Sequence, residues 1–141
     1  MQIGIDLGAT KIEYVVLDSN NSEIVRQREN TPSNYKKLLE TISSIIKRLS
    51  TKYNQNLNVG ICHPGSMDSK GKVFNTYNLK CIKNKKIKND LSSLIPNKLK
   101  FENDANCFAL SESIDGVAKD YNSVFGISLG SGRGGGYVIT V

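Results

Sequence analysis

The hydrophobic pattern of the chain changes from a strand period to a helix period near residue 35. Before it, three short apolar stretches are separated by turn residues such as DSNNS. After it, apolar residues recur every three or four positions, which is one face of an amphipathic helix. The expected strands span 2–8, 10–18 and 22–29 as an antiparallel meander, Thr31–Ser33 caps the helix, and the apolar helix positions are 35, 38, 39, 42, 45, 46 and 49.

The rest of the chain alternates helix and strand patterns. Residues 56–62 and 99–104 have the composition of strands, and a short helix is expected between them at 90–95. A longer helix is expected over 104–118, followed by a strand at 122–130. Three antiparallel strands followed by helix and strand units predict an α/β domain with a mixed sheet.

The length of 141 residues fits one domain. No apolar run approaches the length that spans a bilayer, and residues 1–7 carry an acid and no basic region, so a cytoplasmic location is the default expectation. The three cysteines are odd in number and lack C-x-x-C spacing, which argues against a disulfide framework and against a zinc site in this chain. We expect reduced, mostly buried thiols, and His63 to be a bystander in a loop.

The net charge of +6 arises from residues 80–100, which hold seven lysines and one aspartate. Nucleic-acid surfaces normally interleave such charge with arginine and aromatic residues, and the stretch LKCIKNKKIKND has neither. We therefore interpret this segment as a solvated loop and helix entry. Binding of an anion or a nucleic acid is the alternative.

The first candidate motif is DLGATK, which joins the first two predicted strands. Gly8 and Ala9 lack bulk, so the backbone can approach a phosphate, while Thr10 offers a hydroxyl and Lys11 a positive charge. The carboxylate of Asp6 suits a hydrated Mg²⁺. A plain hairpin turn is the alternative interpretation.

The second candidate motif is ENDAN, where a predicted strand ends and a helix begins. Asn103 and Asp104 follow the carboxyl end of the strand, which is where α/β sheets bind ligands. Asp104 is also a residue type preferred as a helix N-cap, so capping alone is the alternative. Three consecutive polar groups exceed what capping needs, which favours a functional site.

The third candidate motif is the glycine-rich stretch after the strand at 122–130. Backbone N–H groups can converge on an anion at the residues of this stretch, which are Gly130, Ser131, Gly132, Gly134, Gly135 and Gly136. A glycine cluster is a weak signal by itself. Three candidate motifs in order, each after a strand, are a stronger signal together.

Four segments together resemble the ROK family of sugar kinases and repressors, within the actin-like ATPase superfamily. They are IGIDLGATKIE, VGICHPGSMD, FENDANCFALSES and VFGISLGSGRGGG, in the order and approximate spacing of that family. The likeness is closest to the bacterial fructokinase (manno-fructokinase) branch. It spans essentially all 141 residues but only the amino-terminal half of the family's length. The resemblance implies a ribonuclease H-like, actin-like ATPase fold.

The resemblance also implies a hexose kinase that uses ATP and Mg²⁺. Asp104 matches the catalytic aspartate, which takes the proton from the sugar hydroxyl, and Asn103 matches a ligand of the sugar ring. Gly65 and Ser66 match the Pro-Gly loop that lines the sugar pocket. The implied phosphate-binding residues are Asp6, Gly8, Ala9, Thr10 and Lys11 in the first loop, and Gly130, Ser131, Gly132, Arg133 and Gly134 in the second, with Asp6 also the implied Mg²⁺ ligand.

Three residues depart from the family pattern. Ala9 stands where a second glycine is commoner, and Ser131 where threonine is. Arg133 stands where the fructokinase branch has a small or apolar residue, so its guanidinium would either clamp a phosphate or obstruct the loop. The family's zinc motif, adenosine pocket and further sugar ligands have no counterpart in this chain, so zinc is expected only in the missing half.

We therefore expect residues 1–120 to form the amino-terminal lobe of a kinase and residues 121–141 to begin a truncated second lobe. The strand at 134–141 is expected to be frayed or paired with another chain. A first loop at Asp6 leaves no room for the repressors' helix-turn-helix, which favours a kinase. The alternative is a non-catalytic sugar-binding or regulatory remnant. Expected partners are a hexose and ATP, without a membrane or nucleic acid, and a second copy in a full-length homodimer.

Overall fold

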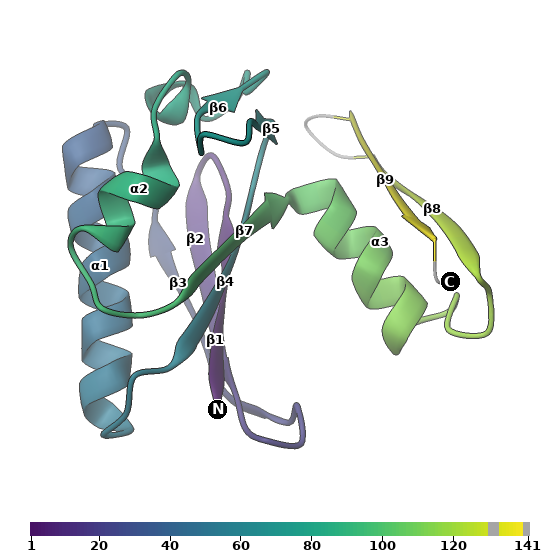
Figure 1. The fold of residues 1–141 in the computed structure, drawn as a ribbon, viewed down its shortest axis with the longest axis horizontal. Coiled ribbons are helices and arrows are strands. Elements are labelled where there is room, and N and C mark those ends of the chain that lie inside the picture. The colour runs from purple at the N-terminus through teal and green to yellow at the C-terminus, as the bar shows by residue number, and fades with distance from the viewer. Residues whose placement is uncertain (130–132, 140–141) are drawn as a thin grey trace. The chain divides into compact units, whose positions relative to one another are not determined.

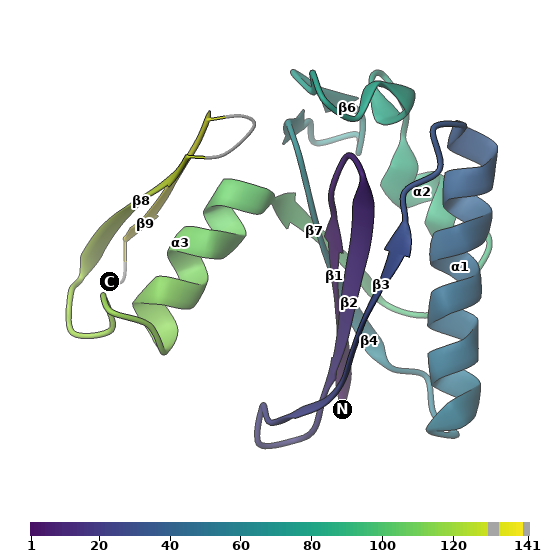
Figure 2. The same ribbon diagram turned by 180° about the vertical axis from the view of Figure 1, so that it is seen from behind.

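The chain folds as two units, Met1–Phe101 and Glu102–Val141. A computed structural model describes residues 1–129 and 133–139. The first unit is a mixed sheet with helices on one face, and the second is a helix packed on a β-hairpin (Figures 1 and 2). The α/β class predicted from the sequence is confirmed. The lobe boundary predicted at residues 120 and 121 concerns the full-length protein and stays a prediction.

The sheet of the first unit has the strand order β3-β2-β1-β4-β7 (Figure 1). β1 pairs antiparallel with β2, and β2 with β3, which confirms the predicted meander. β1 pairs parallel with β4, so the carboxyl ends of these two strands meet at one edge of the sheet. The strands are β1 (Gln2–Leu7), β2 (Lys11–Leu17), β3 (Glu23–Asn30), β4 (Asn58–His63) and β7 (Leu99–Asn103).

Helix α1 (Tyr35–Lys52) covers one face of this sheet with its apolar stripe. Its cap differs from the expectation, because Asn34 and not the Thr31–Ser33 segment is the N-cap, and the Asn34 side chain accepts from the N–H of Lys37. The buried side chains of α1 pack on alternate residues of the strands. These core residues include Leu38, Ile42, Ile45 and Ile46 from the helix and Ile3, Ile5, Leu7, Val59 and Ile61 from the sheet.

Short elements connect β4 to β7. A hairpin of two-residue strands is followed by a 3₁₀ turn and then by a short helix. This helix begins at Ile87, three residues before the predicted start, because Ile87 and Leu91 lie one helical turn apart and are both buried. The Tyr35 hydroxyl donates to Asp90 at 2.5 Å and joins α1 to this helix. The elements are β5 (Ser66–Met67), β6 (Val73–Phe74), η1 (Lys80–Ile82) and α2 (Ile87–Ser92).

The second unit contains α3 (Asp104–Ile114), β8 (Ser123–Leu129) and β9 (Arg133–Ile139). The helix ends four residues before the predicted Ala118, because the Glu112 carboxylate and carbonyl accept the N–H groups of Val117 and Ala118 and fold the chain into a turn. β9 pairs antiparallel with β8 along its whole length. The strand at 134–141 was expected to be frayed or paired with another chain, but its described residues pair with β8 of the same chain.

β9 approaches the first turn of α3 closely. A Cβ built on Gly136 would lie 2.0 Å from the Ala105 carbonyl oxygen, and one on Gly134 would lie 3.1 Å from the Ala105 Cβ. No larger residue fits at position 136 without moving the strand. Part of the glycine-rich stretch is therefore explained by helix packing.

The cysteines form no disulfide, and all three are half-buried, which is less burial than expected. Burial raises the pKa of the Cys81 thiol. Within residues 1–129 and 133–139, no helix is both long and apolar enough to cross a bilayer.

Candidate functional site

The turn between β1 and β2 presents two backbone donors. The N–H of Gly8 donates to the Lys11 carbonyl at 3.0 Å, and the Thr31 hydroxyl donates to the Gly8 carbonyl at 2.8 Å, so the base of the turn is held on both sides. Among the described residues, no hydrogen bond uses the N–H of Ala9 or Thr10. Two unused N–H groups at the tip of a tight turn fit a phosphate oxygen.

The side chain of Lys11 does not extend freely from this turn. Its amino group donates to the Asn30 side chain at 2.5 Å, across the β2–β3 pair. An ammonium group keeps two further donors in such a contact. Lys11 therefore keeps its charge beside the turn while its position is restrained by the neighbouring strand.

Asp6 is the next-to-last residue of β1 and is exposed. The Cys62 thiol donates to Asp6 Oδ1 at 3.3 Å, because the parallel register places Cys62 of β4 directly beside Asp6. No group of three or more metal-binding side chains occurs within residues 1–129 and 133–139. A single carboxylate fits Mg²⁺ that is held mainly by substrate phosphates and water, and not a metal held by protein ligands alone.

The Pro-Gly turn follows β4 at the edge of the sheet where β1 also ends. Gly65 has φ +88°, and a Cβ built on it would lie 2.5 Å from the Phe74 carbonyl oxygen. Glycine is therefore required for both conformation and space. Ser66 is exposed and begins β5. The structure thus places this turn and the Ala9–Thr10 turn at the same edge of one sheet (Figure 1).

His63 was expected in a loop, but it is the last residue of β4 and is 1% exposed. Its Nδ1 lies 3.1 Å from the Pro64 carbonyl oxygen, and its ring lies 6.1 Å from that of Phe101. Its Nε2 has no hydrogen-bond partner among the described residues. The sequence signal was the alternation of β4, which points residues 59, 61 and 63 to the same buried side.

Asn103 and Asp104 are the N-cap and the first residue of α3. Asn103 is the N-cap, and its side-chain oxygen accepts from the N–H groups of Ala105 at 3.0 Å and Asn106 at 3.2 Å. Asp104 is the first helical residue and is exposed, with one carboxylate oxygen 2.9 Å from the Ala105 N–H. The N-cap position is therefore occupied by Asn103, and the Asp104 carboxylate shares the Ala105 N–H with it.

Glu102 supports this helix start, which the sequence analysis did not anticipate. Its carboxylate accepts from the Asn103 N–H at 2.8 Å and from the Asn106 side-chain amide at 2.9 Å. The spacing of Glu102 and Asn106 by four residues around a helix start was the available signal. Cys62 was also missed as a partner of Asp6, since only strand pairing brings these two residues together.

The glycine-rich motif is described in part. Gly130, Ser131 and Gly132 lie outside the described residues. Arg133 is exposed at the start of β9, and Gly134 packs on the first turn of α3. Within the second unit, the structure therefore brings Gly134 and Gly136 of the glycine-rich motif next to the helix that begins with Asp104.

The candidate residues fall into two groups, one in each unit. The first unit carries the β1–β2 turn and the Pro-Gly turn at one sheet edge. The second unit carries Asn103 and Asp104, with Gly134 beside the first helical turn. Each group has backbone or side-chain groups suited to phosphate or hydroxyl ligands.

Comparison with known proteins gives consistent matches. The chain is 37% identical over 139 residues to N-acetyl-D-glucosamine kinase of Vibrio atlanticus, which covers 98% of this chain and 46% of the relative. It is 34% identical over 140 residues to N-acetylgalactosamine kinase AgaK of a Shewanella species, covering 99% of this chain and 45% of that protein. The chain spans about half the length of the curated relatives that it matches.

Solved structures agree with these relatives. A ROK family glucokinase from Streptomyces griseus, in complex with glucose and AMPPNP, superimposes with a TM-score of 0.84 at 28% identity. The superposition covers 98% of this chain and 44% of the glucokinase. Residues 2–140 of this chain match the sequence pattern of the ROK family. The chain belongs to the ROK family.

Proposed function

We propose that this chain supplies the first part of the site of an ATP-dependent hexose kinase. The observation that carries the proposal is the arrangement at the start of α3, where Asn103 occupies the N-cap position and Asp104, the next residue, has an exposed carboxylate. The unused N–H groups of Ala9 and Thr10 support it independently.

The residues of the first unit are assigned to the phosphates. The Ala9 and Thr10 N–H groups donate to phosphate oxygens, and the amino group of Lys11 adds a positive charge. Asp6 would hold Mg²⁺, which supplies charge neutralisation on the phosphates when bound. Gly65 and Ser66 are assigned to the sugar pocket, because they follow the neighbouring strand at the same sheet edge.

The residues of the second unit are assigned to the sugar and the proton. Asp104 accepts the proton of the sugar hydroxyl while the hydroxyl oxygen of the sugar forms a bond to the γ-phosphorus of ATP. The bond between the γ-phosphorus and the β–γ bridging oxygen breaks, and ADP leaves. Asn103 binds a ring hydroxyl. Arg133 and Gly134, together with the glycine-rich residues before them, are assigned to the phosphates.

The sugar is a hexose or an N-acetylhexosamine. The fructokinase branch suggested by the motifs stays a prediction, and the relatives named above act on N-acetyl-D-glucosamine, N-acetylgalactosamine and glucose by name. A substrate panel therefore includes fructose and mannose beside these three sugars.

The test is a chimera in which residues 1–141 replace the corresponding part of the Vibrio kinase. Coupled ADP release and direct detection of sugar phosphate are measured with ATP and each sugar. We expect ATP-dependent phosphorylation of at least one sugar. A folded chimera that binds sugar and nucleotide but forms no sugar phosphate would support the non-catalytic alternative.

A further inference from the structure

One buried titratable side chain of the first unit has no role in the proposed reaction. His63 ends β4 on the buried side of the sheet and is 1% exposed. Nε2 of its imidazole has no hydrogen-bond partner within the part of the chain that the structure describes. A buried polar atom without a partner destabilises a fold, so packing alone favours an apolar ring at this position. The reason for an imidazole here therefore lies with its other nitrogen.

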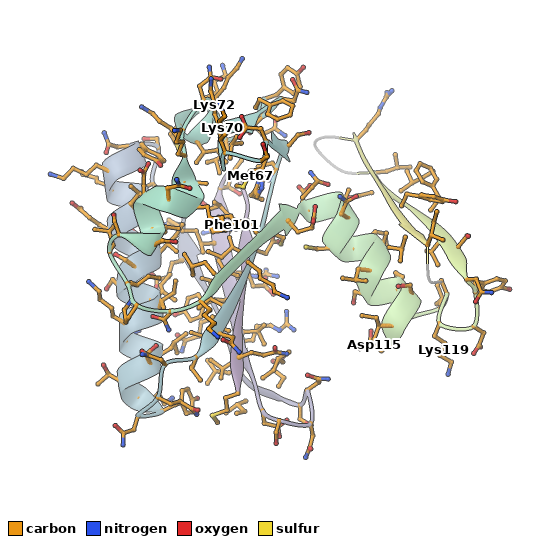
Figure 3. All side chains as sticks on the ribbon, viewed as in Figure 1. Met67, Lys70, Lys72, Phe101, Asp115 and Lys119 are labelled. Carbon is orange, nitrogen blue, oxygen red and sulfur yellow. The ribbon has the colours of Figure 1, made fainter. Side chains whose placement is uncertain are left out.

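That other nitrogen, Nδ1, contacts the turn that follows β4. It lies 3.1 Å from the Pro64 carbonyl oxygen. A carbonyl oxygen only accepts hydrogen bonds, so Nδ1 carries the hydrogen and donates it. The Phe101 ring on β7 lies 6.1 Å from the imidazole and packs beside it. Figure 3 shows Phe101 on β7 and, nearer the end of the sheet, Met67 of β5, which follows the turn.

A second segment also fixes this turn. A Cβ built on Gly65 would lie 2.5 Å from the Phe74 carbonyl oxygen and 3.1 Å from the Thr76 Cβ. Thr76 is buried, and Asn75 has φ +52°, a conformation that residues with a side chain rarely adopt. The Pro-Gly turn is therefore packed against residues 74–76 and hydrogen-bonded to His63.

We propose that His63 is a positioning residue for the sugar. The inference rests on the proposed function, in which Gly65 and Ser66 line the sugar pocket. The Pro64 carbonyl and the Gly65 N–H belong to one planar peptide group, so holding the carbonyl also sets the direction of this N–H. Loss of the Nδ1 donor loosens the pocket without removing a group that contacts the sugar, and it leaves the phosphate-binding turn between β1 and β2 unchanged.

Two substitutions separate this positioning role from packing. His63→Phe keeps an aromatic ring beside Phe101 but has no donor for the Pro64 carbonyl. His63→Asn removes ring volume but places a side-chain amide N–H at about the position of Nδ1, so the donor is kept. Ile61→Val is the matched control for lost packing, because Ile61 lies on the same buried side of β4 and two residues before His63.

Hydrogen exchange of the Ser66 and Met67 amides in residues 1–141 reports on the turn without any substrate. We expect exchange to be roughly threefold to tenfold faster in His63→Phe, as the loss of one hydrogen bond predicts, and within about twofold of the unchanged chain in His63→Asn and Ile61→Val. Thermal unfolding should give a different order, with His63→Asn less stable than His63→Phe. Unchanged exchange in His63→Phe would overturn the proposal.

The chimera described above gives the second readout. His63→Phe should raise the KM for sugar roughly threefold to tenfold, with kcat and the KM for ATP within about twofold, and His63→Asn should restore most of the sugar KM. Ile61→Val should lower the melting temperature and leave the sugar KM unchanged. A sugar KM that follows the melting temperature across the three variants would also overturn the proposal, because packing would then explain it.

This proposal and the proposed function fail in different ways. A folded chimera with His63 in place that forms no sugar phosphate contradicts the kinase activity, and the sugar dissociation constant then replaces the KM in the comparison of variants. An active chimera whose sugar KM is unchanged by His63→Phe contradicts the positioning role alone. Weaker sugar binding in His63→Phe that is restored in His63→Asn supports the positioning role in either case.

Discussion

At the scale of single residues, the start of α3 carries two neighbouring polar residues with different proposed roles. Asn103 satisfies two of the helix's first N–H groups, which is the task of an N-cap. Asp104 comes one position later and is exposed. Substitutions at these two neighbours should therefore have different consequences.

Asp104→Asn in the chimera should lower kcat by roughly 10²- to 10⁴-fold, because the amide keeps the shape but cannot accept the proton. The melting temperature and sugar affinity should change little. Asn103→Ala is the matched control and should cost about 1 kcal/mol of stability through loss of the cap. Steady-state kinetics and thermal unfolding measure both effects. An unchanged kcat for Asp104→Asn would remove the catalytic assignment.

Glu13 gives a prediction for pH. Hydrogen bonds from Arg26, and then from Arg28 opposite it on β3, hold the pKa of the Glu13 carboxyl below its usual value of 4.5. A lowered folded-state pKa stabilises the fold above the unfolded-state pKa, and this contribution is lost as the pH falls through the folded-state pKa.

Glu13→Gln should therefore reduce stability near neutral pH by about 1 kcal/mol or less, as expected for a surface ion pair. The difference from the unchanged chain should shrink as the pH falls below 4.5. Thermal unfolding over this pH range measures it. Glu40→Gln is the control, since Glu40 forms no ion pair with any described residue. A difference that stays constant with pH would contradict the argument.

At the scale of elements, the turn after β4 depends on one backbone conformation. Gly65 has a positive φ and lies against the Phe74 carbonyl, whereas Gly60 within β4 has open space around it. Gly60 lies within β4 and Gly65 lies in the turn that follows it, five residues later. They form a natural pair for testing the turn.

Gly65→Ala should destabilise the chain by more than about 1 kcal/mol, because alanine is strained at this φ and its Cβ meets the Phe74 carbonyl. Gly60→Ala should be close to neutral or slightly stabilising, since nothing lies within 4 Å of the added Cβ. Chemical denaturation of residues 1–141 measures both variants. Equal effects at the two positions would show that the turn does not impose this conformation.

At the scale of the whole molecule, the second unit leaves an apolar surface uncovered. One face of the β8–β9 hairpin packs on α3, and the opposite face is exposed, with Leu129 at 79%. The chain covers 46% of the Vibrio kinase. The exposed apolar residues on that face are Phe125, Ile127, Leu129, Tyr137 and Ile139.

Residues 1–141 alone should show little or no kinase turnover, because the proposed reaction is expected to need a second lobe that closes on the substrates and excludes water. The chimera should restore turnover and reduce binding of a hydrophobic dye to the hairpin. Sugar phosphate formation and dye fluorescence measure these effects. Robust phosphorylation by residues 1–141 alone would contradict the expectation.

Much of the fold follows from local patterns in the sequence. Alternation with turn residues predicts β1 to β3, and the spacing of Leu38, Ile42 and Ile46 predicts α1, because a period of two or 3.6 puts one side of an element against a core. The three motifs were also located by their position after strands. These features depend on residues close together in the chain.

Tertiary structure decided what depends on pairing and packing between distant residues. The parallel β1–β4 register places Cys62 beside Asp6, and the close approach of β9 to α3 explains Gly136. Residue preference could not show whether Asn103 or Asp104 is the N-cap, since asparagine and aspartate cap helices equally well. Periodicity shows which face of an element is apolar. Which element covers that face is determined only when the packed elements exclude water together.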